Sequence, residues 1–282
     1  MRRVLKWVGI TVATLTGVLG VVMAVTNYLS LQKINHVWDV QPQAIQIPDD
    51  AVSQKEGQRL FGARGCAKCH GEDGAGVLIL DNPLIGTLWG ANLTPGEGGV
   101  VRNYTGADWV RTVRHGIKPN GYPLQVMDSK EYQYMSDRDL GLIVSFIRSL
   151  PPVSRATPPQ RISVLSHMWH GLGLLEVTTA DQVDHQRRHD ADPPPGATPE
   201  FGKHLLRLQC QGCHGDGLSG GKLTGAPGLP IPPTSPPTWR RAWGAGLLSS
   251  SPRSCARGVV PTGACWTSSC PGTPTRTCPT TS

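Results

Sequence analysis

Two copies of the pentad C-x-x-C-H, at residues 66–70 and 210–214, restrict what this 282-residue chain can form. Two thiols three positions apart reach the two vinyl groups of one haem, and the histidine that follows places an imidazole nitrogen on the iron. The sequence therefore predicts two covalently attached haem c groups. The predicted attachment and iron-binding residues are Cys66, Cys69 and His70 for the first haem, and Cys210, Cys213 and His214 for the second.

Other uses of paired cysteines explain less of the sequence. A four-cysteine zinc site built from both pairs leaves the two histidines without a role. A thioredoxin-like redox pair requires a βαβ pattern, and none surrounds either motif. The zinc site stays open as an alternative, which a pyridine haemochrome assay distinguishes. The remaining cysteines are not interpreted as a disulfide framework; they are Cys255, Cys265, Cys270 and Cys278.

The composition argues against one large, well-filled core. The chain has 34 glycines and 25 prolines, and aromatic residues make up only 6%. These values differ from those of an ordinary globular domain and favour small domains that pack around a cofactor. The net charge is +7, with no Lys/Arg run interleaved with aromatic residues. Nucleic acid is therefore not a predicted partner.

The N-terminal segment is predicted to anchor the chain in a membrane. Residues 7–29 are apolar, and no charged residue lies between Lys6 and Lys33. A membrane-spanning helix needs about 20 apolar residues. The basic residues before position 7 should stay in the cytoplasm, so the haem domains should lie on the periplasmic side of the inner membrane. A signal peptide cleaved after residues 22–24 is the alternative.

Around the first pentad, the sequence indicates a small helical domain. Gly57 and Phe61 stand four positions apart, on one face of a predicted helix. Ser136 is a predicted N-cap, and apolar residues recur at helical spacing within 140–147. With the pentad, these features make residues 52–153 resemble the class I c-type cytochromes. The resemblance implies an all-α domain that carries single electrons and is not itself an enzyme.

The resemblance also implies a methionine as the sixth ligand of the first haem iron, in the loop before the last helix. Met127 and Met135 both lie there. Met127 is the predicted ligand, because the turn-rich segment 119–123 before it can be held over the haem face, whereas Met135 directly precedes the cap Ser136. A thioether ligand raises the reduction potential. With both axial positions filled, the iron has no site for substrate.

A spacer is predicted between the two pentads, over residues 155–198. Its middle, residues 164–177, can form a helix that carries His167, Met168 and His170. These three residues are expected to pack or to form a docking surface rather than to bind iron. The spacer ends in the proline-rich segment 190–199, which is typical of a stiff boundary.

The pattern of the first domain returns at residue 199 and then breaks off. Gly202 and Leu206 take the positions of Gly57 and Phe61. After Asp216, however, the chain has no acidic residue, methionine or histidine. The second domain is therefore predicted to be incomplete, and the sixth position of its iron to be open, or filled by water or Lys222.

A frameshift after about residue 237 is one hypothesis for the unusual tail at 240–282. With GC-rich codons, another reading frame of this segment can spell MPWHTYAYMSD, which aligns without a gap with residues 127–137. Such a frame supplies both a methionine ligand and the start of a final helix. Resequencing the gene through codons 234–239 tests the hypothesis.

The predicted architecture is all-α, with a membrane anchor (1–30), a cytochrome c domain (50–154), the linker (155–198) and an incomplete second domain (199–282). Segments 92–95 and 109–111 resemble membrane-anchored cytochromes that serve periplasmic dehydrogenases. The predicted partners are therefore a dehydrogenase, a quinol-oxidising complex or a terminal oxidase. The alternative function is a haem-based ligand sensor or enzyme that uses an open iron in the second domain.

Overall fold

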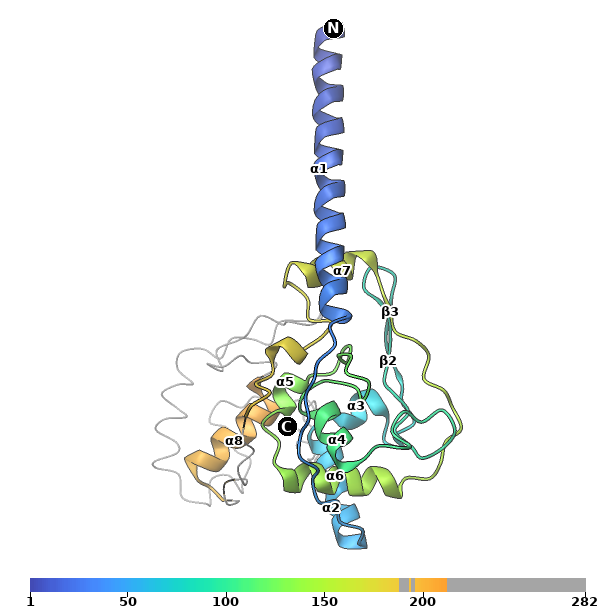
Figure 1. The fold of residues 1–282 in the computed structure, drawn as a ribbon, viewed down its shortest axis with the longest axis vertical. Coiled ribbons are helices and arrows are strands. Elements are labelled where there is room, and N and C mark those ends of the chain that lie inside the picture. The colour runs from blue at the N-terminus through green and yellow to red at the C-terminus, as the bar shows by residue number, and fades with distance from the viewer. Residues whose placement is uncertain (188–192, 194–195, 212–282) are drawn as a thin grey trace, which may run out of the picture.

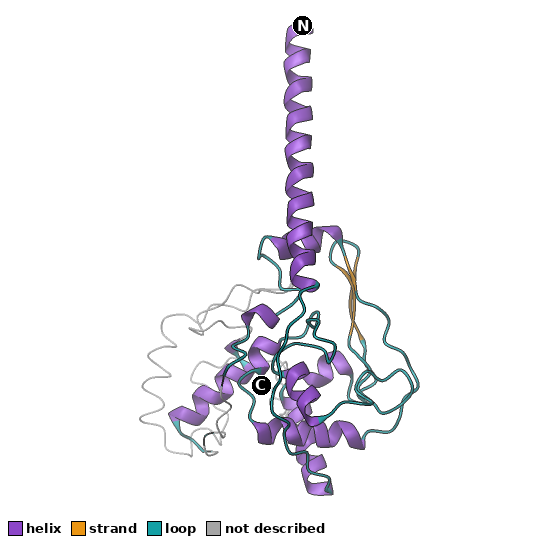
Figure 2. Cartoon of the chain, viewed as in Figure 1, coloured by secondary structure: helices purple, strands orange, loops and turns teal. Residues whose placement is uncertain are grey.

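The computed structural model describes residues 1–187, 193 and 196–211 (Figure 1). Helices make up most of the regular structure (Figure 2). The helices are α1 (Arg2–Ile34), α2 (Ala51–Ala63), α3 (Cys66–His70), α4 (Gly106–Val113), α5 (Ser129–Tyr132), α6 (Asp137–Ser149), α7 (Val164–Gly171), the 3-10 helix η1 (Ala180–Gln182) and α8 (Pro199–Gln209). The predictions made for Cys213, His214, Lys222 and the tail lie outside the described residues.

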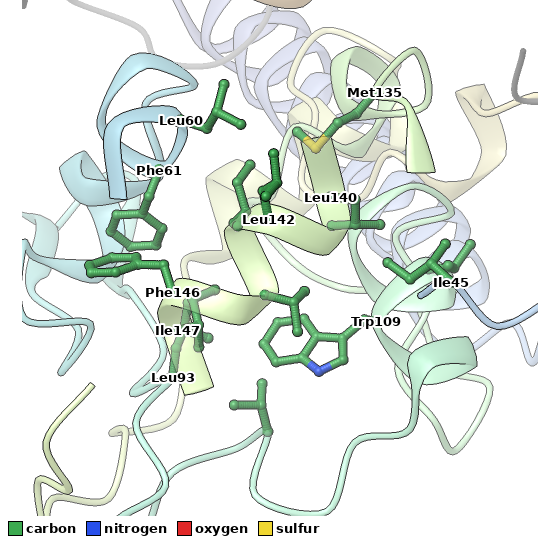
Figure 3. Packing of buried hydrophobic residues seen from close by; sticks show 14 of the residues in the cluster. Ile45, Leu60, Phe61, Leu93, Trp109, Met135, Leu140, Leu142, Phe146 and Ile147 are labelled. Carbon is green, nitrogen blue, oxygen red and sulfur yellow. The ribbon is translucent and has the colours of Figure 1, made fainter. Parts of the chain in front are cut away.

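The crossing of α2 and α6 forms the centre of the first domain. Gly57 permits the crossing, because a Cβ at this position would lie 2.0 Å from the carbonyl oxygen of Leu142. The rings of Phe61 and Phe146 meet at the same crossing, with centroids 5.4 Å apart (Figure 3). These contacts confirm the expectation that Gly57 and Phe61 share a helix face.

Capping residues set where the two crossing helices begin. The Asp50 side chain accepts hydrogen bonds from the first backbone amides of α2. The Ser136 hydroxyl accepts one from the backbone N–H of Asp139, at 3.1 Å, as predicted for the start of α6. Arg64, at the end of α2, then pairs with the buried carboxylate of Asp139 at 2.7 Å. The end of α2 is thereby fixed against the beginning of α6.

The hydrophobic core surrounds this crossing and draws on both halves of the chain. Most of its members come from α2, α4 and α6, and one comes from α8. The core residues are Ile45, Leu60, Phe61, Leu93, Val101, Trp109, Val110, Met135, Leu140, Leu142, Ile143, Val144, Phe146, Ile147, Leu150 and Leu208.

A three-stranded antiparallel sheet departs from the predicted all-α fold. The strands are β1 (Leu78–Asn82), β2 (Gly86–Trp89) and β3 (Arg161–Ile162), in the order β1-β2-β3. The Asn82 side chain accepts backbone hydrogen bonds across the β1–β2 turn. Gly86 has a φ of 134°, and a Cβ there would lie 1.9 Å from the carbonyl oxygen of Arg161. This glycine allows the sheet to add β3 from the stretch that was expected to be a spacer.

Helix α1 projects away from the rest of the chain (Figure 1). Among the described residues it is the one helix long and apolar enough to cross a membrane, with a mean hydropathy of 2.2 over its most apolar window. The rest of the described structure buries none of that window. An apolar surface of this size has no protein partner in the described structure.

The base of α1 packs against α7, which lies nearly across it in Figure 1. The hydroxyl of Ser30 lies 2.9 Å from Nδ1 of His167 and 2.8 Å from Nδ1 of His170. Because a hydroxyl has one proton, it donates to one imidazole and accepts an N–H from the other. The two histidines therefore join α7 to α1, in agreement with the expectation that they pack.

We expect Gly57→Ala to lower the free energy of unfolding of the first domain by about 1–3 kcal/mol, because the added methyl group forces α2 away from the Leu142 carbonyl. Gly62→Ala on the same helix is the matched control, since a Cβ there meets no atom within 4 Å. Denaturant unfolding followed by circular dichroism measures both variants. Equal midpoints for the two variants would contradict the close approach.

Acid should loosen the contact between α7 and α1. Burial lowers the pKa of His170 to about 4, and Lys33 adds to the effect. The separated state therefore binds more protons than the packed state as the pH falls from about 6.5 towards 4, and the packing free energy decreases over that range. Amide-exchange protection of residues 164–171 should be lower at pH 5 than at pH 7. His170→Gln should reduce the difference, and equal protection at both pH values in the unaltered chain would contradict the prediction.

Candidate haem site

The first pentad forms one short helical turn, α3, between two glycines. Gly65 and Gly71 both have positive φ, 78° and 76°, which lets the chain turn tightly into and out of α3. The imidazole Nδ1 of His70 lies 2.8 Å from the carbonyl oxygen of Ala91. Since a carbonyl only accepts hydrogen bonds, Nδ1 carries the proton and Nε2 keeps its lone pair. This is the tautomer that a histidine uses to bind iron through Nε2.

Burial keeps that imidazole neutral. The pKa of His70 is lowered because its buried surroundings disfavour the charged form, and the hydrogen bond to Ala91 only partly offsets this effect. A neutral imidazole is required for metal binding. His70 is thus prepared, in both tautomer and charge, to act as an axial ligand.

A cavity next to His70 contains about 680 Å³ of space not filled by protein atoms, part of it open to solvent. Its walls are almost entirely apolar and come from α2 to α6 and the loops between them. The lining residues are Phe61, Cys66, His70, Ala91, Leu93, Val100, Val101, Tyr104, Trp109, Thr112, Val113, Leu124, Met127, Tyr132, Met135, Leu140, Ile143, Val144 and Ile147.

The two thiols of the first pentad are held in protonated form. Burial raises the pKa of Cys66 to about 12, and burial also raises the pKa of Cys69. Thiolates that bind zinc or act as nucleophiles occupy electropositive surroundings instead. No group of three or more potential metal-binding side chains (His, Cys, Asp or Glu) occurs within the described part of the chain. Buried, protonated thiols suit contact with an apolar porphyrin, whereas Cys213, which the four-cysteine zinc alternative also needs, lies outside the described residues.

A buried hydrogen-bond donor supports the same conclusion. The side chain of Trp109 is 3% exposed and lines the cavity. Its indole Nε1 has no hydrogen-bond partner among the described residues. A buried N–H without an acceptor costs about 1–3 kcal/mol. A haem in the cavity brings carboxylates, which are the acceptors that this N–H requires, so the residues present fit the cofactor.

Both candidate methionine ligands line the cavity, and the structure holds them differently. Met135 is 1% exposed and belongs to the core. Met127 follows Val126, whose φ of 65° is strained for a β-branched residue. Two hydrogen bonds hold this loop: the Val126 N–H donates to the Val177 carbonyl at 2.8 Å, and the Thr179 hydroxyl donates to the Met127 carbonyl at 2.9 Å.

Sequence reasoning missed three contributors to the site. The Ala91 carbonyl orients His70, Trp109 presents the unpaired N–H, and Thr179 holds the Met127 loop. A carbonyl leaves no signature in a sequence. Trp109 was noted only as part of a resembling segment, and Thr179 lies in a stretch that was expected to be a spacer.

The start of the second repeat packs against the first domain. Leu208 on α8 is 4% exposed and belongs to the core of the first domain. The guanidinium groups of Arg187 and Arg207 lie 4.3 and 5.4 Å from the centre of the Tyr134 ring, as cation–π contacts. Helix α8 accordingly lies beside α5 (Figure 1). Of the second pentad, Cys210 lies at the end of this docked helix, whereas Cys213 and His214 lie outside the described residues.

The comparisons with known proteins identify a family for the first domain. Residues 54–151 match the family model described as Cytochrome c. The chain is 29% identical over 180 residues to the alcohol dehydrogenase (quinone) cytochrome c subunit of Gluconacetobacter polyoxogenes, a match that covers 60% of this chain and 37% of the relative. It is 34% identical over 124 residues to the gluconate 2-dehydrogenase cytochrome c subunit of Pantoea cypripedii. This match covers 41% of this chain and 27% of the relative.

A third relative is described as a diheme cytochrome c-type. It comes from Cereibacter sphaeroides and is 30% identical over 118 residues, which cover 38% of this chain and 39% of the relative. The chain therefore spans 27% to 39% of the length of these three relatives.

The helical crossing, the apolar cavity and the prepared histidine define a haem-binding electron-transfer domain. Residues 54–151 form a cytochrome c domain, as the resemblance predicted. A domain of this family holds a covalently bound haem c and carries electrons, which agrees with the predicted cofactor and with the prediction of an electron carrier.

Replacement of Met127 by leucine should remove the methionine-ligated spectrum of one haem and lower its reduction potential, because the soft thioether stabilises Fe(II). Met135→Leu is the matched control, since a volume-conserving change in the core costs less than about 1.5 kcal/mol and leaves ligation intact. Near-infrared circular dichroism and a redox titration measure both variants. The opposite pattern would identify Met135 as the ligand.

Proposed function

We propose that the protein is a membrane-anchored dihaem cytochrome c that passes single electrons at the periplasmic face of the inner membrane. The observation that carries the proposal is the bond from His70 to the Ala91 carbonyl, which presents Nε2 as a ligand beside an apolar cavity and two attachable thiols. The second pentad supports a second haem of the same kind.

The protein groups have separate tasks at the first haem. Cys66 and Cys69 would attach the cofactor, and His70 and Met127 would both bind its iron, which would leave no place for a substrate. The apolar walls exclude water and lower the local dielectric. When bound, haem c supplies an iron that alternates between Fe(III) and Fe(II). At the second haem, Cys210 and Cys213 would attach the cofactor and His214 would bind its iron.

The proposed electron donor is a dehydrogenase, because several relatives are named as cytochrome subunits of dehydrogenases. A quinol-oxidising complex is the alternative donor, and a terminal oxidase is the proposed acceptor. Helix α1 holds the haems at the membrane face, which raises their effective concentration for membrane-bound partners. Because α8 packs on the first domain, Cys210 belongs to the same packed unit as the first haem site. This arrangement favours electron transfer between the two haems.

A second candidate function rests on the composition of the tail. The chain as written has no methionine after Met168. If the second iron has no protein ligand in its sixth position, it can bind a small molecule as a sensor or enzyme. Rapid CO binding by one ferrous haem in the resequenced, full-length protein favours this candidate, and no CO binding favours the carrier.

Mass spectrometry of the purified protein should detect two covalent haems. The pair Cys66→Ser and Cys69→Ser should remove one haem, and the pair Cys210→Ser and Cys213→Ser should remove the other, because each thioether requires its own sulfur. Cys255→Ser is the matched control and should keep two. A colourless protein whose pentad thiols all remain free to alkylate would refute haem attachment. If only one of the two paired variants loses a haem, the protein carries one haem rather than two.

A further inference from the structure

The end of the apolar part of α1 coincides with the point where α7 joins it. Lys6 is the last charged residue before the apolar stretch, and about 20 residues suffice to cross the hydrocarbon core. Twenty positions after Lys6 stands Thr26, which is the first buried residue of α1. A Cβ on Gly171 of α7 would lie 1.9 Å from the Thr26 carbonyl oxygen. Helix α7 is therefore in direct contact with α1 at the level where the span ends.

Helix α7 has two faces of different chemistry. Ser166 and His170 are buried and form hydrogen bonds with the hairpin and with α1. The other face is apolar and only partly covered, and it continues into the residues after the helix. Val164 at the start of α7 is 58% exposed, and Leu172 and Leu174 after it are 51% and 66% exposed. These three side chains leave a large apolar surface without a protein partner among the described residues.

The tip of the β1–β2 hairpin extends this apolar surface. The Ser163 hydroxyl donates to the Leu84 carbonyl, and the Ser166 hydroxyl donates to the Ile85 carbonyl at 2.9 Å. These bonds fix the tip against the beginning of α7, and Figure 1 shows the hairpin reaching the level of α7 at the base of α1. The Leu84 side chain is 63% exposed. We name the surface formed by Leu84, Val164, Leu172 and Leu174 the apolar collar.

We propose that the apolar collar inserts into the lipid interface around α1, so that the cytochrome domain rests on the bilayer in a fixed orientation. The inference depends on the proposed role of α1 as a membrane anchor. Helices that lie in a membrane interface bury an apolar face carrying Trp, Phe or Leu about 5–10 Å into the boundary between headgroups and acyl chains. Trp169, on α7, is of the residue type that is enriched at this depth.

The bilayer fits the collar better than a soluble protein partner does. The collar adjoins the exposed apolar surface of α1, so lipid that surrounds α1 reaches it without a further binding step. Its attraction is apolar rather than ionic, because the described residues place no basic cluster beside it and the nearby Lys33 already faces Asp181 at 3.8 Å. Insertion should therefore occur in zwitterionic membranes and should change little with salt.

Photolabelling of the full-length holoprotein in phosphatidylcholine nanodiscs tests the proposal. A lipid with a photoreactive group in its acyl chain should label peptides from α1, from residues 164–174 and from residues 82–85. Peptides from α6 should remain unlabelled, since α6 is buried within the domain. Mass spectrometry locates the label.

Substitution distinguishes insertion from mere proximity. Leu172→Ser combined with Leu174→Ser should reduce the label in residues 164–174 by about threefold or more, because serine loses the favourable transfer free energy of leucine. Val52→Ser is the matched control, because Val52 is 80% exposed on α2 and lies outside the collar. The haem absorbance of each variant checks that the cytochrome domain is intact.

Each outcome has a separate meaning. Labelled α1 with unlabelled 164–174 would overturn the collar and leave the anchor in place. An unlabelled α1 would overturn the anchor, and with it the basis of this inference. A double serine variant that labels as strongly as the unaltered chain would also overturn the insertion of these side chains.

Discussion

The close approach of Gly57 to the Leu142 carbonyl is the constraint on which the domain depends. With no Cβ between them, α2 and α6 cross in direct backbone contact, and the Phe61 and Phe146 rings fill the space beside the crossing. This arrangement fixes the apolar wall against which α3 presents its two thiols and its histidine. Helices α2 and α6 line the cavity with apolar side chains and also determine its shape. Core packing and cofactor binding therefore depend on one set of side chains.

The site combines features that could be predicted from sequence with others that could not. The pentad spacing predicts Cys66, Cys69 and His70 as the haem-binding residues because the covalent chemistry acts between neighbours along the chain. The tautomer of His70 depends on the Ala91 carbonyl, 21 residues away, and any residue type supplies a carbonyl. The unpaired indole of Trp109 becomes informative only when its burial and lack of a partner are known. Chemistry between neighbours along the chain can therefore be predicted from the sequence, whereas the orientation of a side chain by distant residues requires the fold.

The same distinction between local and long-range signals explains which parts of the fold could be predicted from the sequence. The capped and periodic helices α2 and α6 were predicted, because an N-cap and a helical stripe are local signals. The sheet was missed, because β3 has only two residues and pairs with β2 across more than 70 positions of sequence. Its pairing relies on Gly86, whose missing side chain leaves room for the Arg161 carbonyl. A strand this short has no pattern of its own to detect.

The stretch after residue 155 has a larger part in the structure than a spacer has. It first adds β3 to the hairpin, then packs α7 on the base of α1 through His167 and His170. It then returns to the cavity, where Thr179 bonds to the Met127 carbonyl. One continuous segment therefore connects α1 with the loop that carries the proposed iron ligand. Only seven residues lie between Gly171, which contacts α1, and Thr179, so a short length of chain joins the α1 contact to the Met127 loop.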